Sequence, residues 1–141
     1  AFLAACQHRF IVLKNESSSI ADAYATIKVM IQDYSLDNIS VIANSVLTQN
    51  EGRHLYRSIN SVIKNFLGSE VNYLHSISDD EMLLRAIKAS QPILSFAPAS
   101  PAARDFSTMA DIVEALPKYD SISGGLQFFV ERMAAHQTDK V

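Results

Sequence analysis

The sequence predicts an α/β fold: a partial doubly wound, mostly parallel sheet of three to four strands flanked by helices. Two observations lead to this prediction. Short continuous apolar runs alternate with segments of helical period, the pattern of parallel strands joined by crossover helices. In addition, the 141 residues are 48% apolar and 19% charged, which is enough for one globular domain with a core.

The first unit is a strand at 9–13, a polar turn and a helix that reaches Tyr34. The strand is a continuous apolar run, as expected for a strand buried on both faces of a parallel sheet. Ser19 and Asp22 have capping-box spacing at the start of the helix. Its apolar stripe recurs at intervals of three and four residues: Ile20, Tyr24, Ile27 and Ile31.

The next two units follow the same plan. A second strand at 39–46 leads through the turn TQNEG into a helix at about 53–66, which ends at Gly68. A third strand at 71–74 leads into a loop at 75–78. Ser78 and Glu81 again have capping-box spacing, which predicts a helix that continues to Ala89.

Prolines delimit the last part of the chain. Pro92 predicts a short extended segment at 91–94. Ser100 as N-cap and Pro101 at the first helical position predict a helix that Pro117 stops. The expected domain organisation is therefore an α/β domain at 1–117, a linker at 118–125 and an amphipathic helix at 126–136.

Composition limits the classes of function. A net charge of −3 and a pI near 5.7 argue against nucleic acid as a direct partner. The single cysteine, Cys6, excludes an internal disulfide and fits a reducing cytosol. The chain does not begin with Met, so the first residues are interpreted as a fragment boundary. The four glycines form neither a GxxxxGK[ST] nor a GxGxxG loop, so a phosphate cradle is missing from this sequence.

The segment NESSSIADAYATIK, at 15–28, is similar to the pattern N-x-E-P-T-S-I-T-D-A-Y-A-L-I-K of the flagellar-number regulators FlhG and FleN, which are MinD/ParA-like deviant Walker A ATPases. It is the first of four segments that resemble this family in order. The others are IANSV followed by NEG, the stretch from Tyr73 to Ala86, and the stretch from Pro98 to Ala110. Ser17 departs from the pattern where the family has proline, and His75 where it has glycine.

The resemblance implies that the chain is the carboxyl-terminal half of a P-loop NTPase-like domain. In the full-length family the cofactor is ATP or ADP with Mg²⁺, and the phosphate loop precedes the matching segments. This chain alone is therefore expected to bind no cofactor and to be inactive as an ATPase. The family's partners are a second copy, a flagellar transcription activator or an assembly GTPase. The expected location is the cytoplasm, with peripheral contact at the inner membrane.

The resemblance also assigns residues to a site, and each assignment has a structural alternative. Asn44 matches the position whose amide reads the adenine ring; the alternative is an Asx turn at a strand end. Ile77, Ser78 and Asp79 match the other wall of the base site; the alternative for this loop is helix capping. Glu16 and Asp22 match the dimer or partner surface; the alternatives are a solvated turn and a cap.

The terminal segment carries an apolar face: Leu126, Phe128, Phe129, Val130 and Met133. It resembles the amphipathic segment with which MinD-like proteins touch the membrane. Because only Arg132 and Lys140 are basic there, docking onto the parent domain or a protein partner is an equal alternative.

Metal and nucleophile sites are not indicated. Cys6, His8 and the isolated histidines His54, His75 and His136 lack ligand spacing, and no catalytic residue is assigned. Three hypotheses follow: the carboxyl-terminal portion of a FlhG/FleN-type ATPase, a free-standing non-catalytic binding module of the same fold, or a small enzyme with an unrelated pocket. An unpaired strand edge, which a partial sheet leaves exposed, predicts self-association.

Overall fold

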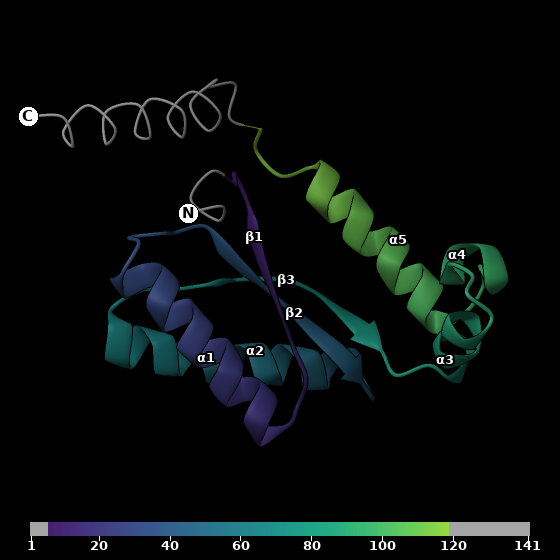
Figure 1. The fold of residues 1–141 in the computed structure, drawn as a ribbon, viewed down its shortest axis with the longest axis horizontal. Coiled ribbons are helices and arrows are strands. Elements are labelled where there is room, and N and C mark those ends of the chain that lie inside the picture. Colours follow the sequence, from purple (N-terminus) through teal and green to yellow (C-terminus); the bar gives the residue numbers. More distant parts are fainter. Residues whose placement is uncertain (1–5, 119–141) are drawn as a thin grey trace, which may run out of the picture.

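A computed structural model of the chain describes residues 6–118 (Figure 1). Its strands are β1 (Arg9–Leu13), β2 (Ile39–Val46) and β3 (Asn72–Ser78). Its helices are α1 (Ser17–Gln32), α2 (Gln49–Leu67), α3 (Glu81–Lys88), α4 (Ile93–Phe96) and α5 (Pro101–Glu114). The predicted terminal helix at 126–136 and the predicted linker, apart from Lys118, lie outside the described residues.

The three strands form one parallel sheet in the order β1-β2-β3, which confirms the predicted fold class. Helix α1 connects the first pair of strands and α2 the second, as parallel neighbours require. The register between β1 and β2 is continuous, from Arg9 opposite Ile39 to Leu13 opposite Ala43. All three carboxyl ends therefore lie at one edge of the sheet, and α3 and α4 lie beyond the end of β3 (Figure 1).

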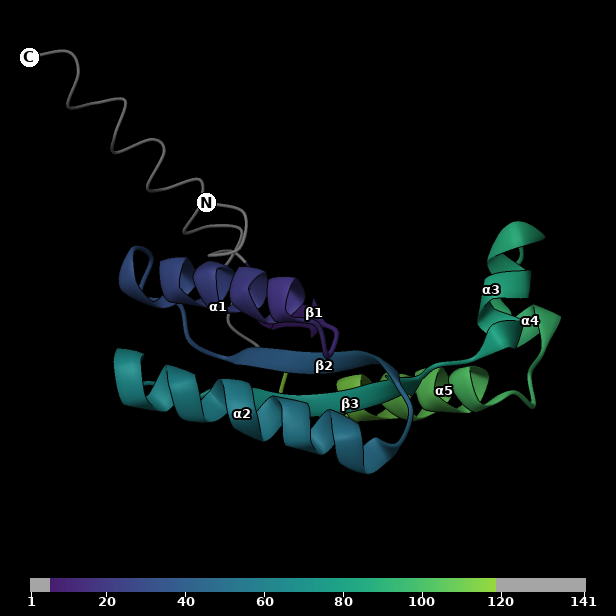
Figure 2. The same ribbon diagram turned by 90° about the horizontal axis from the view of Figure 1, so that it is seen from below.

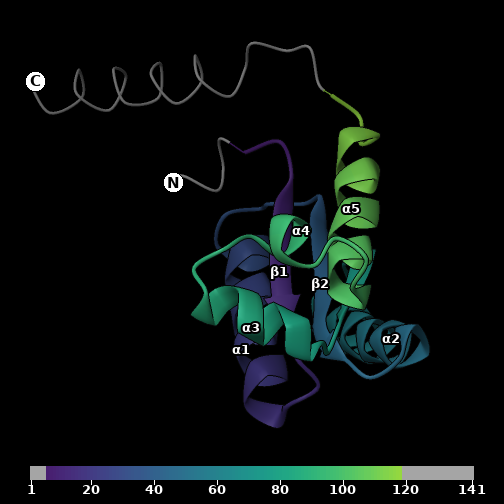
Figure 3. The same ribbon diagram turned by 90° about the vertical axis from the view of Figure 1, so that its right-hand side faces the viewer.

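Successive residues of β2 belong to two separate cores. Val41 and Ala43 pack with residues of α1 and α2, whereas Ile42 packs with residues of α5. Because neighbouring side chains of a strand point to opposite faces, α1 and α2 cover one face and α5 lies against the other. Figure 2 and Figure 3 show this layering from two further directions.

Helix α5 packs mainly against β3 and leaves the same face of β1 open. Leu13 is fully buried on the α1 side, but Phe10 is 39% exposed and Val12 is 58% exposed on the other. The prediction that β1 is buried on both faces is therefore wrong for the described residues. The reason is physical: no described helix lies over β1 on the α5 side.

The two capping boxes predicted from serine spacing are not formed. Helix α1 begins at Ser17, and the Ser19 hydroxyl accepts a hydrogen bond from the Lys14 amide at 2.9 Å. At α3, the cap is Asp80, whose carboxylate accepts from the Met82 amide at 2.9 Å. Ser78 instead belongs to β3, which continues four residues past the predicted end at Leu74.

Helix α2 begins at Gln49, inside the segment predicted to be a turn. The Thr48 hydroxyl caps it by accepting from the Glu51 amide at 3.1 Å. Gly68 ends the helix with a left-handed φ of 63°, as predicted.

None of the described helices combines the length and apolar character needed to cross a membrane.

The extended segment predicted around Pro92 is wrong. The residues after the proline form the short helix α4, closed by hydrogen bonds from the Ser95 and Phe96 amides to the Pro92 carbonyl. Proline restricts the residue before it, while its own φ of −61° suits a helix start. The start of α5 is confirmed: Ser100 caps it, and Pro101 is its first residue.

Candidate functional site

The carboxyl edge of the sheet is the candidate site, because ligands of open α/β sheets bind outside the carboxyl ends of their strands. The middle strand is irregular there. Ala43 lies opposite Ser76 and Val46 opposite Ser78, so β2 contains one residue more than β3 over this stretch. Ser45 takes up the extra length with a left-handed φ of 53°. Such bulges redirect side chains at sheet edges and next to active sites.

Asn44 lies in this bulge and is half-buried. The described residues include no hydrogen-bond partner for its side-chain amide. An Asx turn would require the amide oxygen to accept from the Val46 backbone, so the structural alternative for Asn44 is not formed. Its donor and its acceptor are both available to a ligand, and the assignment of Asn44 to base recognition remains a prediction.

The predicted base-site residues of β3 lie in three different environments. The Ile77 side chain is 2% exposed and packs in the core that α5 shares. Ser78 ends the strand, half-buried. Asp79 is exposed, and its amide donates to the Val46 carbonyl at 2.9 Å. Helix capping here belongs to Asp80, so Asp79 is free of that role. Of this set, only Ser78 and Asp79 have side chains that a ligand can reach.

Asp105 of α5, which the sequence reasoning missed, holds the end of β3. Its Oδ2 accepts from the Ser78 amide at 2.8 Å and from the Ser78 hydroxyl at 2.5 Å. Its Oδ1 accepts from the Gln49 amide group at 3.2 Å and lies 3.6 Å from His75 Nε2. The side chains of Asp105 and His75 are only 15% and 17% exposed, and His75 Nε2 has no hydrogen bond.

A second missed residue, Glu51, joins the loop after β1 to the start of α2. Its carboxylate accepts from the Leu47 amide at 2.7 Å and from the Asn15 side chain at 3.0 Å. These two hydrogen bonds, in that order of importance, lower the pKa of Glu51. The Thr48-x-x-Glu51 spacing of a capping box could have identified Glu51. Asp105 has no local signal, because its partner Ser78 is 27 residues away.

Asp80 connects α3 to α5 beside this site. Its second carboxylate oxygen accepts from the Ala102 amide at 3.0 Å. This hydrogen bond is the main reason that the pKa of Asp80 is lowered, and the bonds from Met82 and Ser100 add to it. Three carboxylates therefore hold the carboxyl edge: Asp80 and Asp105 accept from backbone amides of other segments, and Glu51 accepts from the Leu47 amide and the Asn15 side chain.

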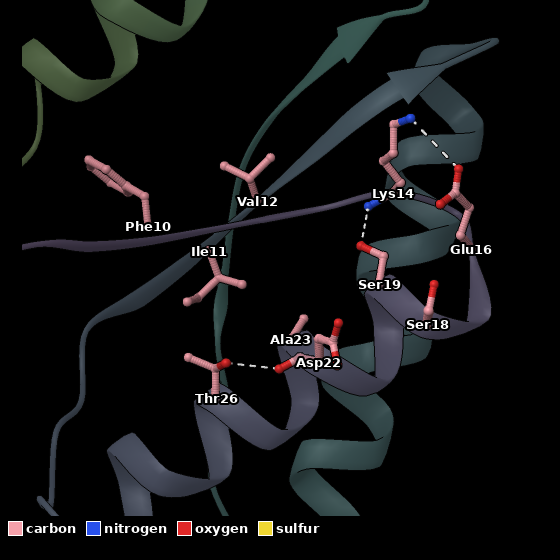
Figure 4. A pocket seen from close by; sticks show the side chains of 10 residues that line it. All are labelled: Phe10, Ile11, Val12, Lys14, Glu16, Ser18, Ser19, Asp22, Ala23 and Thr26. Atoms are coloured by element: carbon pink, nitrogen blue, oxygen red, sulfur yellow. Dashed lines mark hydrogen bonds and ion pairs between the residues drawn. The ribbon is translucent and has the colours of Figure 1, made fainter.

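Glu16 and Asp22, predicted at a dimer or partner surface, both line an open pocket of about 470 Å³ along β1 and α1 (Figure 4). Figure 4 shows Phe10 and Val12 on the side of the strand away from α1, and Ile11 on the side facing it. Glu16 is exposed, makes no side-chain cap and lies 3.7 Å from the Lys14 ammonium. The role assigned to the two acids remains a prediction.

No group of three or more His, Cys, Asp or Glu side chains in the described part is arranged to hold a metal ion. His8 Nε2 donates a hydrogen bond to the Pro117 carbonyl at 3.0 Å. His136 lies outside the described residues.

Two curated proteins are similar to the chain along much of its length. It is 32% identical over 136 residues to the antiactivator FleN of Pseudomonas aeruginosa, covering 96% of this chain and 49% of FleN. It is 35% identical over 99 residues to the flagellum site-determining protein YlxH of Helicobacter pylori, covering 70% of this chain and 33% of YlxH. The chain thus spans half or less of the curated relatives it matches.

A solved structure extends the likeness to the fold. The MinD cell division protein of Aquifex aeolicus superposes with a TM-score of 0.59 at 20% identity, over 83% of this chain and 48% of that chain. A comparison with protein-family models gives no match.

Proposed function

Because the chain is a relative of the FlhG/FleN regulators among the MinD/ParA-like ATPases, we propose that it forms the carboxyl-terminal portion of an ATPase that regulates flagellar number or placement. In this proposal the portion recognises the base of ATP or ADP. It does not hydrolyse ATP by itself, and ATP-dependent dimerisation controls its partner binding.

The open side of β1 is the observation that carries this proposal. β1 has apolar side chains on both faces, yet one of its edges pairs with no described strand, and Phe10 and Val12 are exposed. A strand of this composition is typical of the interior of a parallel sheet. Since the chain covers 49% of FleN, a further α/β half of the kind found in that relative would complete the sheet at β1.

In this proposal, the two halves of the protein bind different parts of the nucleotide. Asn44, with Ser78 and Asp79, would hold the base, and the backbone of Ile77 would support them. A glycine-rich loop and magnesium ligands would come from the other half, because phosphoryl transfer depends on charges placed around the γ-phosphate. ATP or ADP with Mg²⁺ is therefore the cofactor of the completed protein and not of this portion alone.

The proposed partners follow from the relatives. They are a second copy of the protein and a flagellar transcription activator or assembly GTPase, with Glu16 and Asp22 at the contact surface. The proposed location is the cytoplasm. The apolar residues Leu126, Phe128, Phe129, Val130 and Met133 would add peripheral contact with the inner membrane.

Calorimetry with ATP and ADP tests the proposal, on this chain and on the longest natural product that contains it. We expect nucleotide binding and hydrolysis by the longer product only. Asn44→Ala should weaken its binding of ATP by about tenfold, the loss of one or two hydrogen bonds. Asn50→Ala, an exposed change in α2, is the matched control. A longer product that binds neither nucleotide would contradict the proposal.

A free-standing binding module is the second candidate, favoured by an apolar groove. The groove has a volume of about 740 Å³ and lies between α3, α4 and α5. Its rim includes Ile87, 64% exposed, and Leu94, 50% exposed, and such contiguous apolar surface is typical of protein contacts. This candidate gains support if no longer product exists and the chain binds neither ATP nor ADP.

A further inference from the structure

The hydrogen-bond donors at the end of β3 are already used within the protein. The Ser78 amide and the Ser78 hydroxyl both donate to Asp105 Oδ2, at 2.8 and 2.5 Å. The Asp79 amide donates to the Val46 carbonyl at 2.9 Å. What Ser78 and Asp79 still offer to a ligand are acceptors: the lone pairs of the Ser78 hydroxyl and the exposed Asp79 carboxylate.

Purines differ in the polarity of the group at position 6. Adenine carries an amine that donates, whereas guanine and hypoxanthine carry an oxygen that accepts. Acceptors at Ser78 and Asp79 match the amine and repel the oxygen. Asn44 cannot make this distinction alone, because its free amide has both a donor and an acceptor and satisfies either base after a flip.

We infer that Asp105 determines the base preference of the proposed nucleotide site, by engaging both donors of Ser78 and leaving only acceptors toward the base. This inference rests on the proposed function. Asp105 is a specificity-determining residue that acts through Ser78, and nothing in the family resemblance assigns it a role.

The position of the carboxylate is fixed from several sides. Ala102 and Ala103, fully buried, let α5 approach β3 closely enough for a short aspartate side chain to reach Ser78. Gln49 of α2 donates to Oδ1 at 3.2 Å. With 15% of the side chain exposed, competition from water is reduced, and the Ser78 hydroxyl keeps its proton directed at α5.

Removing the carboxylate should free the two donors. In Asp105→Ala, the Ser78 amide and hydroxyl become available to a 6-oxo group. In Asp105→Leu, which keeps the branched shape of the side chain but has no acceptor, the same two donors are also released. In both variants, the affinity for inosine triphosphate should therefore rise relative to the affinity for ATP.

The test measures the affinities of ATP and inosine triphosphate for the longest natural product that contains the chain. We expect the wild-type protein to prefer ATP by about tenfold, the penalty for one mispaired polar contact. Both Asp105 variants should reduce this ratio toward one. Asp111→Asn, an exposed change on the same helix, should leave it unchanged. Amide hydrogen exchange of Ser78 without nucleotide should accelerate in Asp105→Ala.

The outcomes separate the two proposals. If neither nucleotide binds the wild-type protein, the proposed function fails. If the wild-type protein binds both nucleotides equally, or if the variants weaken both in proportion, Asp105 has only a structural role and the inference is overturned. Should Asp105→Ala fail to fold, the affinity ratio of Asp105→Leu decides alone.

Discussion

The two outer strands of the sheet, β1 and β3, have different surroundings. β3 is covered on one face by α2 and on the other by α5, and Leu74 and Ile77 are nearly inaccessible. Among the described helices, only α1 covers β1, and Phe10 and Val12 on the other face of β1 are exposed. One parallel sheet therefore has a closed side, where helices cover both faces of the outer strand, and an open side, where one face of the outer strand is exposed.

The largest expected effect is the difference in stability between truncating an apolar side chain on the closed side of the sheet and truncating one on the open side. Leu74→Ala, in the core beneath α5, should lower the free energy of unfolding by about 2–5 kcal/mol, because it leaves a cavity. Val12→Ala, at a side chain that is 58% exposed, should change it by no more than about 0.5 kcal/mol. Urea unfolding of both variants measures the difference. Equal losses would mean that β1 is already covered in solution.

The packing of α2 on the closed side gives the second prediction. A Cβ atom added at Gly52 would lie 1.8 Å from Ser76 Oγ and 2.8 Å from Ser76 Cβ. Gly52→Ala should therefore cost about 1–3 kcal/mol of unfolding free energy. Adding Ser76→Gly to Gly52→Ala should recover part of this loss in a double-mutant cycle. A Gly52→Ala protein as stable as wild type would contradict the close approach.

The open side predicts self-association through β1, because its edge, which pairs with no described strand, and its exposed face offer a template for another chain. Sedimentation of residues 1–141 at rising concentration should reveal larger species. Val12→Lys should weaken the self-association by about tenfold, since a charged side chain on an edge strand disfavours pairing with another chain. Val62→Lys, at a valine of α2 that is 41% exposed, is the matched control. A clean monomer at high concentration would rule out this use of the edge.

The smallest effect concerns the Asp80 link between α3 and α5. The pKa of Asp80 is lowered from its ordinary 3.8, chiefly by the Ala102 amide, so the folded state favours the carboxylate. The stabilisation that the Asp80 carboxylate gives to the folded state is complete above pH 3.8. It is lost as the pH falls through the lower pKa that Asp80 has in the folded protein. Asp80→Asn should therefore be less stable than wild type at pH 7. In thermal unfolding, the difference in melting temperature between the two proteins should become smaller toward pH 2. A constant gap would mean that the hydrogen bonds do not depend on charge.

The order of strands and helices could be read from local patterns, because each depends on residues within one turn or one strand. Ser100 and Pro101 mark the start of α5 on the printed sequence and in the structure alike. The serine cap at Ser78 was predicted wrongly because of a contact that is not local. Ser78 has the spacing of a cap, but the ladder from β2 continues to it and the cap moves to Asp80.

The candidate site was less predictable, because its geometry depends on contacts between distant residues. Asn44 could be singled out only by resemblance, and the bulge that frees its amide appears only once β2 and β3 are paired. Asp105 was not noticed because an aspartate inside a helix is usually solvated. Its reach to Ser78 depends on two alanines that bring α5 onto the sheet.

The strand order β1-β2-β3 is also the order in which a ribosome makes the strands. No strand has to be inserted between two that are already paired, so each newly made strand adds to an existing edge once its helix has formed. Each such closure spans only one helix and its turns, which keeps the entropy cost of parallel pairing modest. The described strands can therefore pair in the order in which they are made, one strand and one helix at a time.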